Sequence, residues 1–188
     1  MAEQSSLVRL LRNYEIDLDW IGFELHPETP PGGVPVSTFF PADQLEETQR
    51  YLTDFAARFD IDDMQITGHV PNTRRALAAT ELARDEGRLH AFREAAMSGF
   101  WRHGIDVESD DGLRRFAEET GLDPDAVVRA ADDPDYLARV DALRDEAHAR
   151  GVTAIPAFFF GDQPFPVVGC QPYELLARAA EAAGARKR

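Results

Sequence analysis

Hydrophobic residues change their spacing several times along the chain, and each change predicts a different kind of element. The first residues carry leucines at helical spacing, which indicates the end of a helix near Asn13. Between Tyr14 and Leu25 apolar residues alternate with acidic ones, so we expect a strand with one solvent-exposed face. The run 27–33, rich in proline and glycine, excludes regular structure at that point.

The long middle of the chain has apolar positions at helical spacing. Asn72 is a good N-cap residue, and Pro124 follows Asp123 in the way that proline follows an acidic cap at a helix start. These patterns predict helices over residues 43–59, 72–86, 89–101, 111–120, 124–131 and 136–150.

The last part of the chain returns to strands. We expect a buried strand over 157–160, a turn over 161–164, a second strand over 165–168 and a helix over 172–183. The order is therefore partial helix, strand, long helical segment, hairpin and helix. This order predicts an α/β fold in which the two ends of the chain share one sheet.

The charged residues of the chain exclude some classes of function. The 188 residues include 34 acidic and 20 basic ones, and a net charge of -14 disfavours a nucleic-acid partner because such a chain repels phosphate backbones. The only basic cluster is Arg186-Lys187-Arg188, which we expect to be a frayed tail. Lys187 is the only lysine, which excludes Schiff-base and P-loop chemistry.

No segment is predicted to enter a membrane or to hold a metal ion. The longest apolar run, 157–160, is far too short to span a bilayer, and residues 1–6 lack the features of a secretory signal. The histidines and the paired acidic residues do not have metal-ligand spacing. Cys170 is the only cysteine, so the chain forms no disulfide within itself and a cytoplasmic location is expected.

Four segments, taken in order, resemble one known family. They are residues 20–33, Pro71-Asn72-Thr73, residues 121–124, and residues 151–160 with the following 168–171. Together they are similar to the thioredoxin superfamily, and within it to the FrnE-like branch of the DsbA family, over about residues 7–183. The resemblance implies a thioredoxin-like fold with an inserted all-helical domain. Residues 1–60 and 151–188 would form the thioredoxin-like domain, incomplete at its N-terminus, and residues 61–150 the helical insertion.

The resemblance also implies a substrate-binding edge at Ala154, Ile155 and Pro156. In the family a cis peptide bond precedes the matching proline, and the neighbouring backbone groups pair with an extended polypeptide substrate. The alternative is an ordinary proline at the edge of a strand.

The residues that define activity in this family are not in the sequence. The resemblance implies thiol–disulfide exchange by a Cys-x-x-Cys motif at the start of the first helix, where the helix N-terminus lowers the pKa of the thiol. The chain has no such motif, and nothing before Leu7 matches the family's first strand, which lies between the strands matching 14–25 and 157–160. One hypothesis is that Met1 is an internal methionine of a longer natural product. Its rival is a shortened, redox-inactive member that fills the gap by forming a homodimer or with another strand.

Cys170 has two interpretations. It lies just before Pro172 at an expected helix start, so that a helix N-terminus would favour its thiolate. It could then form a mixed disulfide, although a single thiol cannot complete a dithiol cycle. Alternatively, it is a small packed side chain without chemistry.

Three functions therefore remain open. The first is a DsbA-like thiol–disulfide oxidoreductase or isomerase whose partners are protein thiols and disulfides, with no cofactor. The second is glutathione-dependent chemistry, as in 2-hydroxychromene-2-carboxylate isomerases and kappa-class glutathione transferases, which use serine in place of the first cysteine. The third is a redox-inactive module that binds extended peptides at Ile155-Pro156.

Overall fold

The computed structural model describes residues 4–39, 42–44, 47, 50, 53–54, 57, 64 and 68–188. More than half of the helix expected over 43–59 lies outside the described residues, as does the expected domain boundary after residue 60. The helices that the structure describes with their bounds are α1 (Gln4–Asn13), α3 (Arg74–Asp85), α4 (Leu89–His103), α5 (Asp110–Thr120), α6 (Pro124–Ala131), α7 (Pro134–Ala149) and α8 (Tyr173–Ala182). The strands are β1 (Tyr14–Glu15), β2 (Val34–Pro35), β3 (His69–Val70), β4 (Ala157–Phe158), β5 (Val167–Val168) and β6 (Arg186–Lys187), and short 3₁₀ turns cover Val36–Thr38 and Ala42–Gln44.

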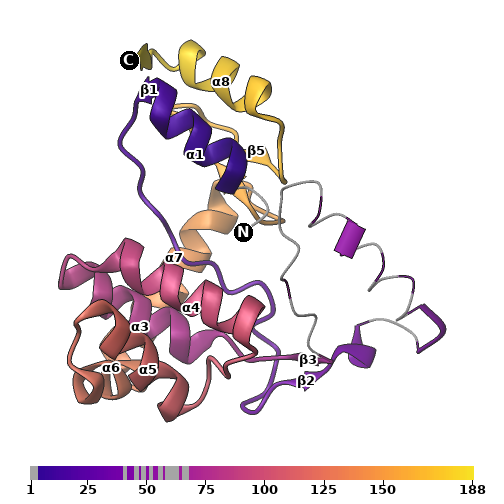
Figure 1. Ribbon diagram of the computed structural model, residues 1–188, viewed down its shortest axis with the longest axis vertical. Helices are drawn as coiled ribbons and strands as arrows, with labels where there is room; N and C mark the ends of the chain where they lie inside the picture. Colours follow the sequence, from indigo (N-terminus) through magenta and orange to yellow (C-terminus); the bar gives the residue numbers. More distant parts are fainter. Residues whose placement is uncertain are drawn as a thin grey trace.

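Helices α3 to α7 form a helical lobe, in which α3 to α6 enclose one hydrophobic core and α7 packs against α3 and α6 (Figure 1). Phe92 and Phe116 meet edge to face at its centre, with 6.2 Å between ring centroids. A side chain at Gly99 would overlap the Phe116 ring, so the close approach of α4 and α5 requires glycine there. The buried core residues are Ala79, Ala83, Phe92, Ala95, Val107, Leu113, Phe116, Ala117, Val127 and Ala131.

The helix starts in this lobe follow the capping signals of the sequence. Thr73, not Asn72, occupies the N-cap position of α3, but Asn72 Oδ1 accepts a hydrogen bond from the N–H of Arg74, the first residue of the helix, at 2.9 Å. The prediction of a helix over 124–131 is confirmed. Helix α7 begins two residues earlier than expected, because Asp133 caps it and Pro134 occupies its first position.

Helices α1 and α8 enclose a second hydrophobic core, and we call this part of the molecule the terminal lobe. The two helices lie side by side, away from the helical lobe (Figure 1). Extended residues at both ends of the chain pack against the same core, among them Ile16, Trp20 and Phe158. Its buried residues are Leu7, Leu10, Tyr14, Leu176, Ala177 and Ala180.

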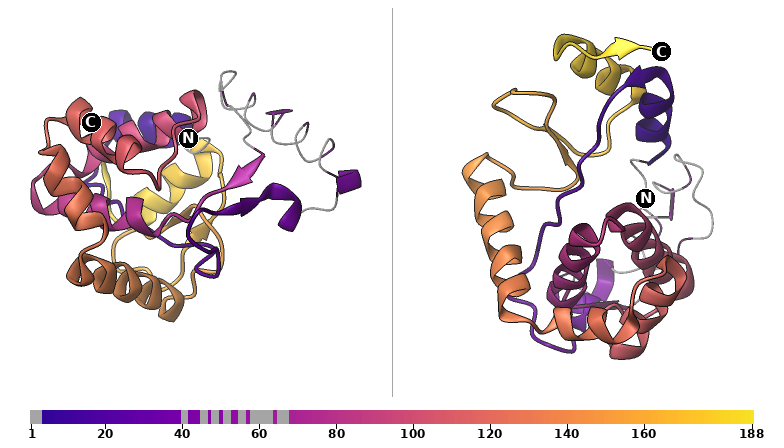
Figure 2. Two further views of the ribbon diagram at one scale, coloured as in Figure 1. Left: turned by 90° about the horizontal axis from the view of Figure 1, so that it is seen from below. Right: turned by 90° about the vertical axis from the view of Figure 1, so that its left-hand side faces the viewer.

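The strands are shorter than expected and form three separate two-stranded ladders: β1 with β6, β2 with β3, and β4 with β5. The prediction of one strand from Tyr14 to Leu25 is wrong beyond Glu15, because residues 16–25 are extended but have no ladder partner among the described residues. In the right-hand view of Figure 2, these residues descend from α1 to the helical lobe, while α7 leads into the β4–β5 hairpin. The two ends of the chain therefore share a hydrophobic core and the short β1–β6 ladder, but not the single sheet that we expected, because β4 and β5 form a ladder of their own.

The C-terminal basic cluster is ordered against β1, so the expectation of a frayed tail is wrong. Arg186 pairs with Glu15 across the ladder, with 2.8 Å between Nη2 and Oε2. Lys187 Nζ lies 2.8 Å from Glu181 Oε1, and the Arg188 N–H donates to the Asn13 carbonyl at 2.9 Å. Backbone pairing and opposite charges together hold this end of the chain in place.

A buried carboxylate fastens the extended segment to the helical lobe. Glu24 is only 2% exposed and accepts from Arg74 Nη1 at 3.1 Å and Arg144 Nη1 at 2.7 Å. Asp141 binds both arginines in turn, at 2.7 Å from Arg74 Nη2 and 3.2 Å from Arg144 Nη2. Since a buried charge is tolerated only when it is paired, this network fixes the path of residues 21–25.

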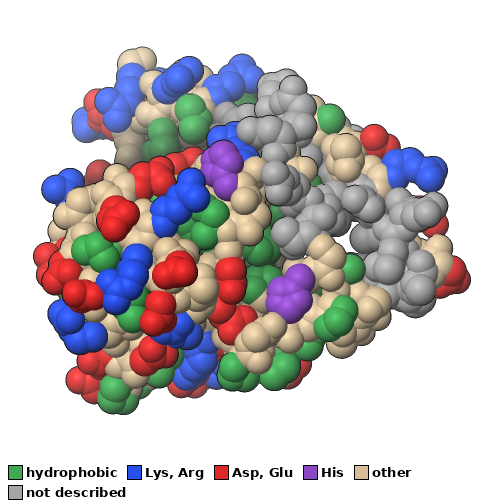
Figure 3. All heavy atoms as spheres, turned by 60° about the horizontal axis from the view of Figure 1, so that its bottom comes forward, with side chains coloured by type: hydrophobic (Ala, Val, Ile, Leu, Met, Phe, Trp, Pro, Cys, Tyr) green, Lys and Arg blue, Asp and Glu red, His purple; other side chains and the backbone are tan. Residues whose placement is uncertain are grey.

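Acidic and basic side chains are interspersed over the helical lobe on the face drawn in Figure 3. In the described part of the chain, none of the helices has the length and apolar composition needed to cross a membrane.

The network predicts an acid-sensitive contribution to stability. The Arg74 guanidinium lowers the pKa of the Asp141 carboxyl in the folded protein. The unfolded chain therefore binds more protons in acid, and the contribution is complete above the unfolded pKa and lost as the pH falls through the lowered one. We expect Asp141→Asn to cost about 0.5–1 kcal/mol at neutral pH and to weaken the loss of stability between about pH 5 and pH 2, as measured by urea denaturation. If the free energy of unfolding of the variant fell as steeply with pH as that of the original protein, this assignment would be wrong.

Candidate functional site

The chain leaves α7 through a turn that presents residues 153–155 at the surface. Gly151 adopts a positive φ of 82°, and the buried Val152 donates its N–H to the Ala147 carbonyl at 2.9 Å. Ala154 is exposed, and the side chain of Ile155 is 47% exposed. The Ile155–Pro156 peptide bond is cis.

Among the described residues, one backbone edge of the hairpin that follows has no ladder partner. The Pro156 carbonyl accepts from the Gly169 N–H at 2.7 Å, and Phe158 pairs with Val167. Hydrogen-bonded pairs alternate with non-bonded pairs in an antiparallel ladder, so the N–H and C=O of Ala157 are directed to the opposite edge of β4. Residues 153–155 make no backbone–backbone hydrogen bond within the described part of the chain. This edge can therefore accept an extended polypeptide by strand addition.

Cys170 lies at the same end of the hairpin. It directly follows Gly169, whose N–H binds the Pro156 carbonyl, and it is half-buried. Three residues later α8 begins at Tyr173, after the N-cap residue Pro172. The structure thus brings together all four residues that the sequence singled out: Ala154, Ile155, Pro156 and Cys170. Their roles in binding or exchange stay predictions.

A cleft of about 450 Å³, which no pattern in the sequence predicts, lies between the two lobes. Helix α1 and the extended segment 16–20 form its apolar wall, and α4 forms its polar wall. The Arg93 guanidinium carbon lies 3.5 Å from the centroid of the Trp20 ring. The leucine spacing and the alternation after Tyr14 indicated the apolar faces, but not that α4 lies opposite them. The lining residues are Leu7, Val8, Leu11, Ile16, Asp17, Leu18, Trp20, His90, Arg93 and Glu94.

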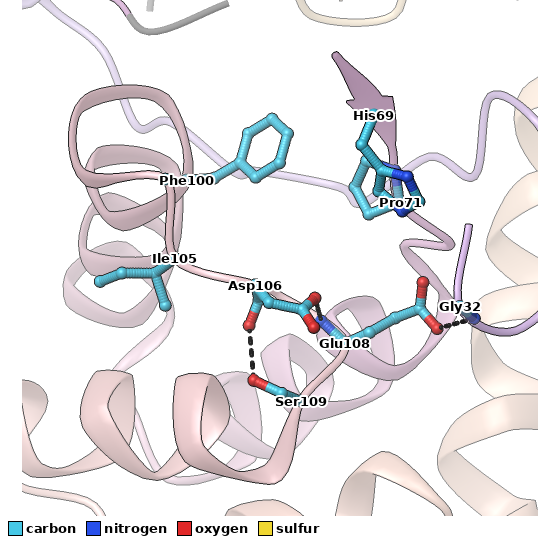
Figure 4. A pocket seen from close by; sticks show the side chains of 9 residues that line it. Gly32, His69, Pro71, Phe100, Ile105, Asp106, Glu108 and Ser109 are labelled. Atoms are coloured by element: carbon cyan, nitrogen blue, oxygen red, sulfur yellow. Dashed lines mark hydrogen bonds between the residues drawn. The ribbon is translucent and has the colours of Figure 1, made fainter. Parts of the chain in front are cut away.

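A second cavity of about 450 Å³ lies where the loop 27–33 meets the helical lobe (Figure 4). His69, Pro71 and Phe100 lie on one side of it, and Asp106, Glu108 and Ser109 on the other (Figure 4). The Glu108 carboxylate accepts from two backbone N–H groups, Gly32 and Asn72, each at 2.7 Å. One carboxylate oxygen thus holds the loop at Gly32, and the other holds the chain just before α3, so Glu108 has a structural role in this cavity. Within the described ranges, no group of three potential metal ligands is found.

A family model described as "DSBA-like thioredoxin domain" matches residues 1–181. The chain belongs to this family. The DSBA-like domain matches expectation in its order of elements, with the helical lobe between the two parts of the chain that form the terminal lobe.

Two curated proteins are similar to this DSBA-like domain. A 2-hydroxychromene-2-carboxylate isomerase from Sphingobium xenophagum is 36% identical over 83 residues, which are 44% of this chain and 43% of the isomerase. The matched segment is thus less than half of the isomerase's own length. A protein of Bacillus subtilis (strain 168), YwbO, whose name assigns no activity, is 24% identical over 159 residues, 83% of this chain and 78% of that protein.

Two solved structures share the fold. A "probable DsbA oxidoreductase" from Streptomyces coelicolor superposes with a TM-score of 0.83 at 24% identity, covering 97% of this chain and 83% of that one. A 2-hydroxychromene-2-carboxylate isomerase superposes with a TM-score of 0.75 at 20% identity, covering 97% of this chain and 87% of that one.

Proposed function

We propose that this chain is the polypeptide-binding part of a thiol–disulfide exchange protein of the FrnE-like branch. One observation carries the proposal: the exposed backbone of Ala154 and Ile155 lies beside the cis bond to Pro156 and is unpaired within the described residues. An extended segment of a substrate protein would pair with these backbone groups, and its side chains would contact the exposed Ile155. We further propose a cytoplasmic location, in keeping with a chain that has a single cysteine.

Binding of a substrate polypeptide and thiol–disulfide exchange depend on different residues. A thiolate attacks the substrate disulfide to form a mixed disulfide and release one substrate thiolate, and a second thiol then attacks the mixed disulfide. Two thiols are therefore needed, and this chain has only Cys170. The residues present here supply the binding edge, and the dithiol of a complete exchange protein is not among them.

We expect Ile155→Asp to weaken the binding of unfolded polypeptide by about tenfold or more, because it places a charge on the apolar edge. The measurement is the fluorescence anisotropy of a labelled substrate, which is an unfolded protein whose cysteines have been reduced and alkylated. Since Ile155 is exposed, the variant should keep its thermal unfolding midpoint.

The matched control is Ile21→Asp, which makes the same change at a side chain that is also 47% exposed but belongs to the extended segment before Glu24. An equal loss of binding in both variants would show that the edge at Pro156 is not the site.

We also expect the chain to be inactive as a dithiol catalyst. Reduction of insulin by dithiothreitol should proceed at the background rate with the chain present, and Cys170→Ser should make no difference. A rate well above background that disappears with Cys170→Ser would contradict this expectation, because it would require one thiol to sustain turnover.

A second candidate is glutathione-dependent isomerisation or transfer. The match of 36% over 83 residues to a 2-hydroxychromene-2-carboxylate isomerase favours it, with glutathione as the cofactor. If this candidate is correct, we expect isothermal titration calorimetry to show that reduced glutathione binds the chain. Ile155→Asp should weaken that binding. Absence of heat at millimolar glutathione would exclude glutathione chemistry on this chain and leave the polypeptide-binding proposal standing.

A further inference from the structure

Arg150 is the charged residue nearest in sequence to the polypeptide-binding edge at residues 153–155. It is the C-cap residue of α7, and Gly151 then turns the chain toward the edge. The guanidinium carbon lies 3.7 Å from the centroid of the Phe159 ring. The phenylalanines on either side of Phe159 both pack on the core of the terminal lobe, so Phe159 lies on the outer face of the hairpin. Arg150 is therefore held against this outer face, beside the turn that presents the edge.

The contacts of Arg150 leave its N–H donors able to bind a carboxylate. Contact with an aromatic ring stabilises the cation without supplying a conventional hydrogen-bond acceptor. Glu146 Oε1 is 3.7 Å from Arg150 Nη1, which is longer than a hydrogen bond, and the two side chains are 62% and 39% exposed. Such an exposed pair contributes little. A carboxylate that approaches the guanidinium in its plane can accept two parallel hydrogen bonds.

The segments that form the edge contain no acidic residue. Neither residues 147–161 nor residues 163–173 include Asp or Glu, although the whole chain has 34 of them. Arg150 is the only arginine or lysine in these segments. The other basic side chain there, His148, has its Nδ1 3.2 Å from the Val152 carbonyl oxygen. A strongly acidic chain thus has one permanent positive charge and no negative one in the sequence around its binding edge.

We propose that Arg150 is a specificity-determining residue of this edge, and that it selects extended polypeptide segments in which an acidic side chain accompanies apolar ones. Apolar side chains of the segment would contact Ile155, and the carboxylate would accept hydrogen bonds from the guanidinium that Phe159 supports. This inference rests on the proposed function, because it requires a polypeptide at residues 153–155.

Three labelled nine-residue peptides test the proposal by fluorescence anisotropy. Each repeats Thr-Val-X three times, and X is Glu, Gln or Lys. Every third position falls alternately on the two faces of a strand, so one X side chain can reach the guanidinium in any register. We expect the Glu peptide to bind about threefold tighter than the Gln peptide, despite the net charge of -14 on the chain.

Charge reversal separates Arg150 from the field of the whole chain. In Arg150→Glu the ratio of the affinity for the Glu peptide to that for the Lys peptide should fall about tenfold, because attraction and repulsion exchange places. The matched control is Arg129→Glu, which changes the net charge equally. Arg129 belongs to α6 in the helical lobe, and its side chain is 71% exposed. This variant should leave the ratio unchanged.

Two milder variants distinguish charge from packing on Phe159. Arg150→Lys keeps the positive charge and should retain most of the preference for Glu over Gln. Arg150→Gln removes the charge and should abolish that preference. Thermal unfolding of each variant verifies that lost binding does not reflect lost folding.

The outcomes that overturn this inference differ from those that overturn the proposed function. An unchanged ratio in Arg150→Glu, an equal shift in Arg129→Glu, or equal affinity for the Glu and Gln peptides would exclude selection by Arg150. The binding edge itself would still stand if Ile155→Asp weakened the binding of all three peptides. If the original chain bound none of the peptides, or if Ile155→Asp had no effect, the proposed function would be wrong, and the role of Arg150 with it.

Discussion

The buried carboxylate of Glu24 is the interaction on which the arrangement of the two lobes depends. Each lobe has its own hydrophobic core, and a core alone does not determine how the chain between the lobes runs. Glu24 supplies that constraint, since its charge is stable in the interior only while Arg74 of α3 and Arg144 of α7 remain bound to it. The edge of the Phe23 ring also meets His148 near the end of α7, with 5.3 Å between ring centroids. The same short segment thus fixes both the start of α3 and the end of α7.

The helices could be predicted because their signals are local. The side chains of Asp123 and Asn72 each accept a hydrogen bond from the backbone N–H two residues further along the chain. Such contacts join residues that are close together in the sequence, so the sequence alone predicts them. The bounds of α6 were accordingly found to the residue, and those of α3 to within two residues.

The sheets could not be predicted in the same way, because pairing joins residues far apart in sequence. Alternation after Tyr14 correctly indicated which side chains face inward, but alternation is satisfied by packing on α1 and α8 without a ladder. The pairing of Glu15 with Arg186 has no local signal at all. At the candidate site, the residues around Pro156 were found through a resemblance, whereas the cleft with Arg93 over Trp20 needs the relative placement of α1 and α4.

The ordered C-terminus has a practical consequence for anyone who handles this protein. Lys187 carries the only side-chain amine of the chain, and it is held beside Glu181 and the ring of Tyr14. Among the side chains, an amine-reactive reagent would therefore attach at one structurally defined place. A dye or a surface linker coupled there would sit at the β1–β6 ladder, on the terminal lobe, and all molecules immobilised through it would share one orientation.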